Sequence, residues 1–223
     1  MAKIQPFAPE HVCLRCRTPF NSAFPLGPER ICLACRIEAT QFDAAYCYGQ
    51  YDGVLPQLIH LLKYARVQTL AQPLGRLLLN GFPREERVDA LVPVPVSWLK
   101  RFRRGFNQSE MLARVVSRST SLPVRNLLRS KTGPSQAGLN SRERRLNVRG
   151  RFSLRRRASV AGRRLMLVDD VFTTGATLNA CARVLKNAGA ARVTVLALAR
   201  ADRRSPGFPN SLVEPVAMER GVR

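Results

Sequence analysis

The fold of this chain is decided by residues 165–178, which read LMLVDDVFTTGATL. Residues 165–168 are large and apolar, which suits a strand buried on both faces. Two acidic residues follow where we expect the strand to end, and a run that reads as a helix begins at Leu178. Free backbone N–H groups and the positive end of a helix dipole point into the short loop between them. The stretch therefore predicts a phosphate-binding site at the carboxyl end of a strand.

Asp169 and Asp170 would repel a phosphate unless they face another part of the ligand. A ribose diol donates hydrogen bonds to carboxylates, and a metal ion is the other partner that suits them. A plain strand-to-helix turn with two solvated aspartates is the alternative. The stretch resembles the phosphoribosyl pyrophosphate (PRPP) signature of type I phosphoribosyltransferases. In that case Asp169 and Asp170 are catalytic and hold the ribose hydroxyls. The residues that bind the 5′-phosphate are then Thr173, Thr174, Gly175, Ala176 and Thr177.

The net charge indicates a polyanionic partner. The 223 residues suit one α/β domain with a small appendage, and they carry a formal charge of +22. Residues 100–164 hold 19 Lys and Arg against two acids, Glu110 and Glu143. Nucleic acid or an array of phosphates fits this concentration, whereas an arginine-rich solvated surface explains only part of it.

Four cysteines near the N-terminus predict a structural zinc site. Two C-x₂-C pairs supply Cys13, Cys16, Cys32 and Cys35, a spacing typical of tetrahedral zinc. With all four positions filled by cysteine, the Zn²⁺ supports folding or docking rather than catalysis.

The cysteine content and hydropathy indicate the compartment. Six cysteines fit a reducing cytoplasm with a metal site. No run of about 18 apolar residues predicts a membrane span, and residues 1–11 do not read as a secretory signal. We therefore expect a cytoplasmic protein.

The flanking segments predict the rest of an α/β domain. Strands are expected at 45–51, 90–96 and 192–199, and helices at 54–64, 70–82 and 178–188. Lys63, at a helix end, suits either a phosphate contact or compensation of the helix dipole. A β-loop-α-β unit would place residues 169–177 at the carboxyl edge of the sheet, where such folds bind ligands.

A basic crossover, residues 100–108 (KRFRRGFNQ), follows the strand at 90–96. Its arginines suit pyrophosphate or a nucleic-acid backbone, and its phenylalanines suit base stacking or core packing. We assign Arg101 and Arg104 to the substrate, and Arg103 and Phe106 to nucleic acid. Asn107 is expected to cap the next helix.

Residues 131–164 read as a long polar loop, of the kind that forms a lid or a binding loop. A short basic helix is expected at 141–148. Lys131 is assigned to the substrate. The loop residues assigned to nucleic acid are Arg142, Arg144 and Arg145.

Taken in order, the motifs VPVP, RFRRGFNQ, KTGPSQAGL, RERRLNVRGRF and VDDVFTTGATL resemble the ComF family, as does the four-cysteine module. The resemblance implies a type I phosphoribosyltransferase-like parallel sheet flanked by helices, with an N-terminal zinc finger. It also implies a role with imported single-stranded DNA in natural transformation, beside a helicase-like partner. We expect a zinc module at 1–41, the main domain at 42–201 and a tail at 202–223.

Three functions remain open on the sequence. The first is a phosphoribosyltransferase in which Mg²⁺ accompanies PRPP, although no histidine near residues 165–178 offers a base for an acceptor. The second is a DNA-binding adaptor that senses PRPP or keeps a vestigial site. The third is an interaction module whose zinc finger recruits a partner.

Overall fold

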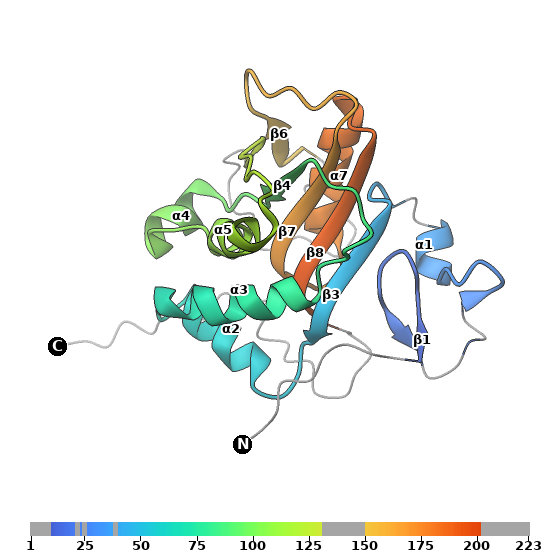
Figure 1. The fold of residues 1–223 in the computed structure, drawn as a ribbon, viewed down its shortest axis with the longest axis horizontal. Coiled ribbons are helices and arrows are strands. Elements are labelled where there is room, and N and C mark those ends of the chain that lie inside the picture. The colour runs from blue at the N-terminus through green and yellow to red at the C-terminus, as the bar shows by residue number, and fades with distance from the viewer. Residues whose placement is uncertain (1–9, 21–22, 24–25, 38–39, 131–149, 202–223) are drawn as a thin grey trace, which may run out of the picture.

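A four-stranded parallel sheet forms the centre of the molecule. The computed structural model describes residues 10–20, 23, 26–37, 40–130 and 150–201. The sheet has the order β3-β8-β7-β4 (Figure 1), and each neighbouring pair is parallel. Its strands are β3 (Ala44–Gln50), β4 (Ala90–Pro93), β7 (Arg164–Phe172) and β8 (Arg192–Arg200). The predicted α/β class with a parallel sheet is confirmed.

Helices and short strand pairs surround this sheet. The helical segments are α1 (Leu33–Ile37), α2 (Leu55–Lys63), the 3₁₀ turn η2 (Gln68–Leu70), α3 (Ala71–Asn80), α4 (Trp98–Arg104), α5 (Gln108–Thr120) and α7 (Ala176–Asn187). The antiparallel pairs are β1 (His11–Val12) with β2 (Pro19–Phe20), and β5 (Leu128–Ser130) with β6 (Phe152–Leu154). The predicted segments 45–51, 54–64, 70–82 and 192–199 agree with β3, α2, α3 and β8 to within two residues.

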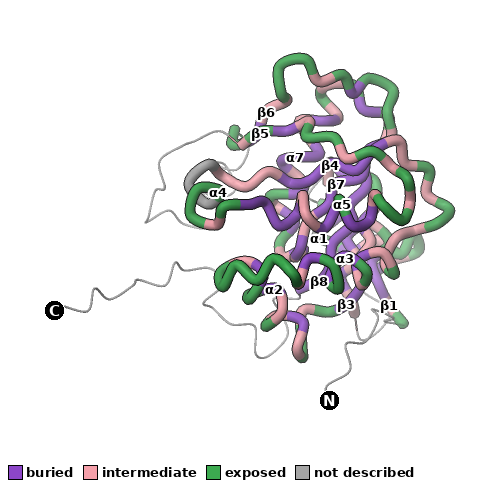
Figure 2. Tube along the Cα trace, turned by 60° about the vertical axis from the view of Figure 1, so that its left-hand side comes forward, coloured by how far each residue is buried: buried purple, intermediate pink, exposed green. Residues whose placement is uncertain are grey.

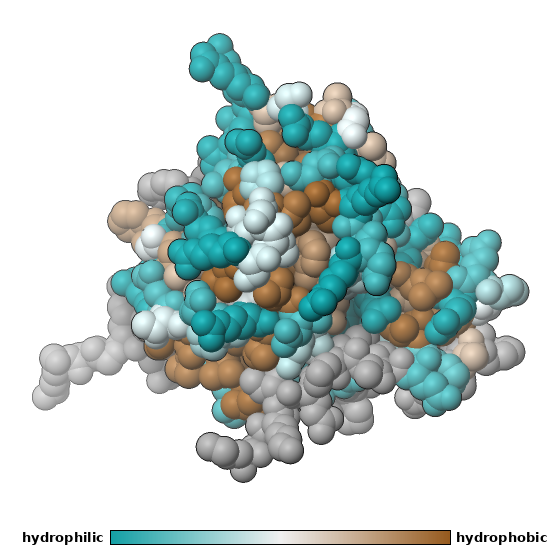
Figure 3. All heavy atoms as spheres, viewed as in Figure 1, coloured by the Kyte–Doolittle hydropathy of each residue, from teal (hydrophilic) through white to brown (hydrophobic). Residues whose placement is uncertain are grey.

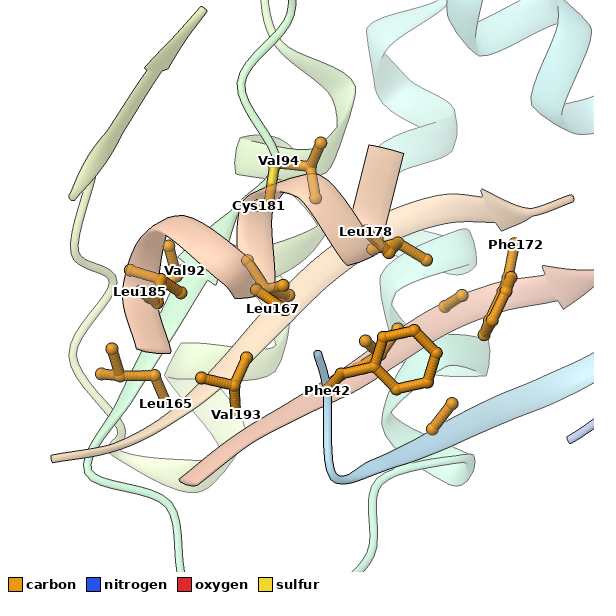
Figure 4. Close-up of a cluster of buried hydrophobic side chains, with 14 of the residues drawn as sticks. Phe42, Val92, Val94, Leu165, Leu167, Phe172, Leu178, Cys181, Leu185 and Val193 are labelled. Carbon is orange, nitrogen blue, oxygen red and sulfur yellow. The ribbon is translucent and has the colours of Figure 1, made fainter. Parts of the chain in front are cut away.

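Alternate residues of β7 enter two separate cores. Leu165 and Leu167 pack on the side of α7, and Figure 4 shows them with Cys181 and Leu185 of that helix. Met166 and Val168 belong to the opposite core, which α2, α3 and α5 close. Figure 2 shows buried residues concentrated along the sheet. Four successive apolar residues occur in β7 because both of its faces are covered.

The two acidic residues lie inside β7 and not after it, so the prediction that the strand ends at residue 168 was wrong. Asp169 lies opposite Ala197 of β8, and this pairing continues to Phe172. β4 is shorter than expected, because its pairing with β7 ends where Pro93 lies opposite Val168. Pairing with β8, the next strand along the chain, sets the length of β7.

The cysteine module, the described part of residues 10–37, lies beside β3 (Figure 1). Its four cysteines are buried and share the core on the α7 side with Phe42. The predicted domain limits at residues 41 and 201 stay predictions. Among the described residues, none of the helices is long and apolar enough to span a bilayer.

Candidate active site

An ion pair lies at the carboxyl end of the sheet. Lys63, the last residue of α2, places its Nζ 3.0 Å from Oδ1 of Asp170. The two side chains are 17% and 5% exposed. Burial alone lowers the pKa of Lys63, but the charge of Asp170 and the hydrogen bond to it outweigh that effect, so the pKa lies above its ordinary value. The second carboxylate oxygen of Asp170, Oδ2, is buried and has no hydrogen-bond partner within the described residues.

The carboxylate of Asp169 is held by hydrogen bonds. Its Oδ1 accepts from Ser109 Oγ at 2.9 Å and from the backbone N–H of Asp170 at 2.9 Å. Burial, followed by the neighbouring charge of Asp170, raises the pKa of Asp169 to about 7. The two adjacent carboxyls therefore differ in their partners, one facing an ammonium group and the other a hydroxyl.

The first turn of α5 reaches Asp169 because Asn107 fixes it. The side chain of Asn107 accepts from Ser109 N at 3.1 Å and donates to the carbonyl of Val94 at 3.1 Å. The predicted cap at Asn107 is confirmed. Sequence reasoning missed Ser109, and its position in the first turn after the cap is the only local signal that could have indicated it.

The loop between β7 and α7 makes a glycine turn into the N-terminus of a helix. Gly175 has φ +76°, and a Cβ there would lie 2.7 Å from Cε2 of Phe172, so only glycine fits. α7 begins at Ala176, earlier than the predicted residue 178. The first N–H groups of a helix have no partner within the helix and attract anions. Thr174 and Thr177 are exposed beside them.

The N-terminus of α7 thus follows two carboxylates and the partly buried ammonium group that pairs with one of them. A ligand that carries hydroxyls at one end and a phosphate at the other satisfies both parts. A simple phosphate satisfies only the loop.

The arginines that we assigned to substrate lie on α4. Arg104 donates to Gln108 Oε1 at 3.1 Å, and its guanidinium lies 4.9 Å from the centroid of the Tyr64 ring. Arg101 lines a cavity of about 150 Å³ with Pro93, the last residue of β4, and with Pro95, two residues further on. The structure thus places Arg101 near the carboxyl end of β4.

The two residues of the crossover assigned to nucleic acid differ in exposure. Arg103 is exposed, and its carbonyl accepts a hydrogen bond from Arg66. Phe106 is 9% exposed and packs in the core closed by α2, α3 and α5, which leaves little of its ring for a base. Phe102 is 74% exposed on the same segment. Hydrophilic residues cover much of the face that carries α4 (Figure 3).

Lys131, Arg142, Arg144 and Arg145 lie outside the described residues, as does the predicted helix at 141–148.

The four cysteines of the module form a candidate metal centre. The sulfur atoms of Cys13, Cys16, Cys32 and Cys35 all lie within 4.8 Å of one another. Cys16 Sγ and Cys32 Sγ are 3.7 Å apart, and tetrahedral zinc with bonds of about 2.3 Å requires about 3.8 Å. A hydrogen bond with Cys16 lowers the pKa of Cys13, and one with Cys13 raises that of Cys35. The four-sulfur donor set and its spacing fit Zn²⁺.

The chain is similar to a known family model and to several known proteins. A family model described as phosphoribosyl transferase domain matches residues 79–212. The chain is 34% identical over 169 residues to Competence protein F of Haemophilus influenzae, which covers 72% of this chain and 74% of the relative. It is 36% identical over 158 residues to DNA utilization protein YhgH of Escherichia coli K12, with 67% and 69% covered. A solved allosteric regulatory enzyme of purine biosynthesis matches 59% of this chain and 26% of its own, at 24% identity and a TM-score of 0.41.

Proposed function

Since the chain belongs to the ComF family of phosphoribosyltransferase-like proteins, we propose that it binds PRPP at the carboxyl end of β7. We further propose that it acts on imported single-stranded DNA in natural transformation. The observation that carries the first proposal is Asp170 Oδ2, a buried acceptor without a partner among the described residues, beside an anion-binding loop. The ribose diol of PRPP supplies the missing donor.

PRPP has a chemical group for each part of the site. Its 5′-phosphate meets the N–H groups and hydroxyls of residues 173–177. Its ribose hydroxyls meet Asp169 and Asp170, and Lys63 keeps the second carboxylate in place. We propose that Arg101, Arg104 and Lys131 face the pyrophosphate, and that Mg²⁺ bound with PRPP neutralises its charge.

The proposed reaction is displacement at C1′ of the ribose. The bond from C1′ to the pyrophosphate oxygen breaks, pyrophosphate leaves with the electron pair, and an acceptor nucleophile forms the new bond. Positive charge that develops on the ribose ring is stabilised by the carboxylates of Asp169 and Asp170.

The second candidate function is a DNA-binding adaptor that senses PRPP without transferring it. The charge of +22 favours a role with nucleic acid in either case. We propose Arg103 and Phe102 as DNA contacts, with Phe102 in place of the buried Phe106 as the stacking ring. A cytoplasmic location is proposed on the cysteine content, and a helicase-like partner on the family resemblance alone.

The first experiment is calorimetric titration of PRPP and Mg²⁺ into zinc-loaded protein. We expect binding that is lost in the double variant Asp169→Asn, Asp170→Asn. Asp89→Asn is the matched control, because this carboxylate pairs with Arg164 at 2.7 Å near the opposite end of β7. Wild-type protein that does not bind PRPP would refute the proposal. Release of pyrophosphate on addition of single-stranded DNA would separate the transferase from the adaptor.

The second experiment measures single-stranded DNA binding against salt concentration. Arg103→Ala should weaken binding and reduce the slope of log affinity against log salt by about one. Arg84→Ala, an exposed arginine in the loop between α3 and β4, serves as the control. Equal effects of the two variants would contradict a contact at Arg103.

A further inference from the structure

A buried arginine occupies the end of β8 without an acidic partner. Arg200 is 8% exposed, and none of the described carboxylates forms an ion pair with it. Its guanidinium instead donates to oxygen atoms of two remote parts of the chain and to the carbonyl of the adjacent Ala201. A buried cation is costly unless such partners are well placed, so these contacts constrain both parts.

One set of contacts holds the start of the anion-binding loop. Arg200 Nη1 donates to the carbonyl of Phe172 at 2.8 Å and to the carbonyl of Thr173. The guanidinium carbon also lies 4.4 Å from the centroid of the Phe172 ring. Gly175 lies against the ring of Phe172. The ring of Phe42 packs edge-on against the same Phe172 ring, with the two centroids 5.8 Å apart (Figure 4). Arg200 thus fixes both the first peptide of the loop and the ring beneath its glycine.

The other set of contacts reaches the cysteine module. Arg200 Nε donates to the carbonyl of Cys16 at 3.2 Å, and Nη2 donates to Thr18 Oγ1 at 2.7 Å. Thr18 Oγ1 lies 3.0 Å from Cys16 Sγ. A metal-bound thiolate only accepts hydrogen bonds, so the Thr18 hydroxyl must donate to the sulfur and accept from Arg200. Metal binding at Cys16 therefore fixes the direction of the hydrogen bond between Thr18 and Cys16, whereas Arg200 donates to Thr18 in either state.

The charge of the metal-loaded cysteine module also favours its contact with Arg200. Four thiolates around a divalent cation carry a net charge of about −2. That charge would compensate a guanidinium that has no carboxylate partner among the described residues. The loaded module and Arg200 are electrostatically complementary.

We propose that Thr18 and Arg200 couple metal loading of the four-cysteine module to the geometry of the anion-binding loop. In the loaded protein the loop holds its amides in place for a phosphate group, and in the metal-free protein it loosens. Arg200 is a positioning residue in this scheme. The ligand in question is PRPP, so this part of the inference rests on the proposed function.

Two readouts on the full chain test the coupling. The first is amide hydrogen exchange in the peptide 172–178, which needs no ligand, and the second is calorimetric affinity for PRPP with Mg²⁺. Thr18→Val removes the hydroxyl at nearly constant volume, and Thr18→Ser restores it. Thr120→Val is the matched control, because its hydroxyl donates to the carbonyl of Val116 at 2.9 Å on α5.

We expect Thr18→Val to retain one zinc per chain, to speed exchange in 172–178 and to weaken PRPP binding about five- to tenfold, as for one lost hydrogen bond. Thr18→Ser and Thr120→Val should stay within about twofold of wild type. Zinc removal from wild type by a chelator should reproduce the faster exchange while circular dichroism shows that the sheet persists. Arg200→Lys, which leaves the cysteines intact, repeats the test if Thr18→Val loses its metal.

Failure of the coupling and failure of PRPP as the ligand give different results. A zinc-loaded Thr18→Val protein with wild-type exchange in 172–178 would overturn the coupling, whether or not PRPP binds. Wild-type protein that does not bind PRPP, but whose loop exchange responds to zinc, would refute the proposed ligand and support the coupling.

Discussion

Removal of the ammonium group that faces Asp170 should destabilise the ligand-free protein. Lys63→Met keeps the length and burial of the side chain but leaves the carboxylate of Asp170 without its counter-charge. At 3.0 Å and an effective dielectric constant of about 20, the attraction between the two charges is about 5.5 kcal/mol. Desolvation of two side chains that are only 17% and 5% exposed offsets most of this gain.

Loss of one partner leaves the desolvation of the other uncompensated. We therefore expect Lys63→Met to lower the free energy of unfolding by about 3 kcal/mol, the low end for a broken buried pair. In a chain of this size that corresponds to a fall of roughly 6–12 °C in the unfolding temperature. Urea denaturation followed by circular dichroism measures the first quantity, and scanning calorimetry the second.

A double-mutant cycle isolates the pair. Lys63→Met combined with Asp170→Asn should cost about 2 kcal/mol less than the sum of the single variants, because no unpaired charge remains. Lys186→Met is the matched control: its Nζ lies 2.8 Å from Asp43, but those side chains are 26% and 32% exposed, so less than about 1 kcal/mol is expected. The reasoning would be refuted if the stability losses of Lys63→Met and Asp170→Asn were additive in the double variant. It would also be refuted if Lys63→Met and Lys186→Met lowered the free energy of unfolding equally.

Three further predictions concern the neighbouring carboxyl, the loop and the metal. Asp169→Asn should raise the unfolding temperature at pH 8, because the pKa of this carboxyl is about 7 when folded and about 3.9 when unfolded. The protonated carboxyl therefore stabilises the folded protein below about pH 4, and this stability is lost as the pH rises to about 7. The increase in unfolding temperature caused by Asp169→Asn should thus vanish near pH 4. An equal increase at pH 4 and pH 8 would contradict the raised pKa. Gly175→Ala should cost about 1–2 kcal/mol of stability in backbone strain, and contact of the new Cβ with the ring of Phe172 should add to this cost. Gly162→Ala is the control, because Gly162 has φ +71° but open space around it, so only the backbone strain is expected there. Urea denaturation measures both losses. Cys13→Ala should lose the bound zinc in atomic absorption measurements while Cys47→Ala, outside the cluster, retains it; zinc retained by the first variant would exclude the four-cysteine site.

The features that could be predicted are those that depend on residues close together in the sequence. The turn after β7, the glycine at φ +76° and the cap at Asn107 follow from sterics and hydrogen bonds within a few residues. The two C-x₂-C pairs likewise predict a cluster, because each pair presents two thiolates from one tight turn. Even here the end of β7 was misplaced, since β8 determines how far the strand continues.

The partners of the acidic pair could not be predicted in the same way. Ser109 lies 60 residues from Asp169, and Lys63 approaches Asp170 from another helix on the same face of the sheet. Sequence reasoning left Lys63 undecided between a phosphate and the helix dipole, and only the structure places it against a carboxylate. Phe102 and Phe106 are equally apolar, and the packing of α4 and α5 alone decides which one is exposed.

By itself, therefore, the sequence determined the parallel α/β class, the glycine turn that leads from β7 into α7 and the four cysteines that suit zinc. These depend on backbone conformation and hydropathy over short stretches, which the residues themselves dictate. The tertiary structure decided which charges face one another, and it joined Arg200 to Thr18 across 182 positions. Strand order and register bring such groups together, and neither is encoded in the residues adjacent to them.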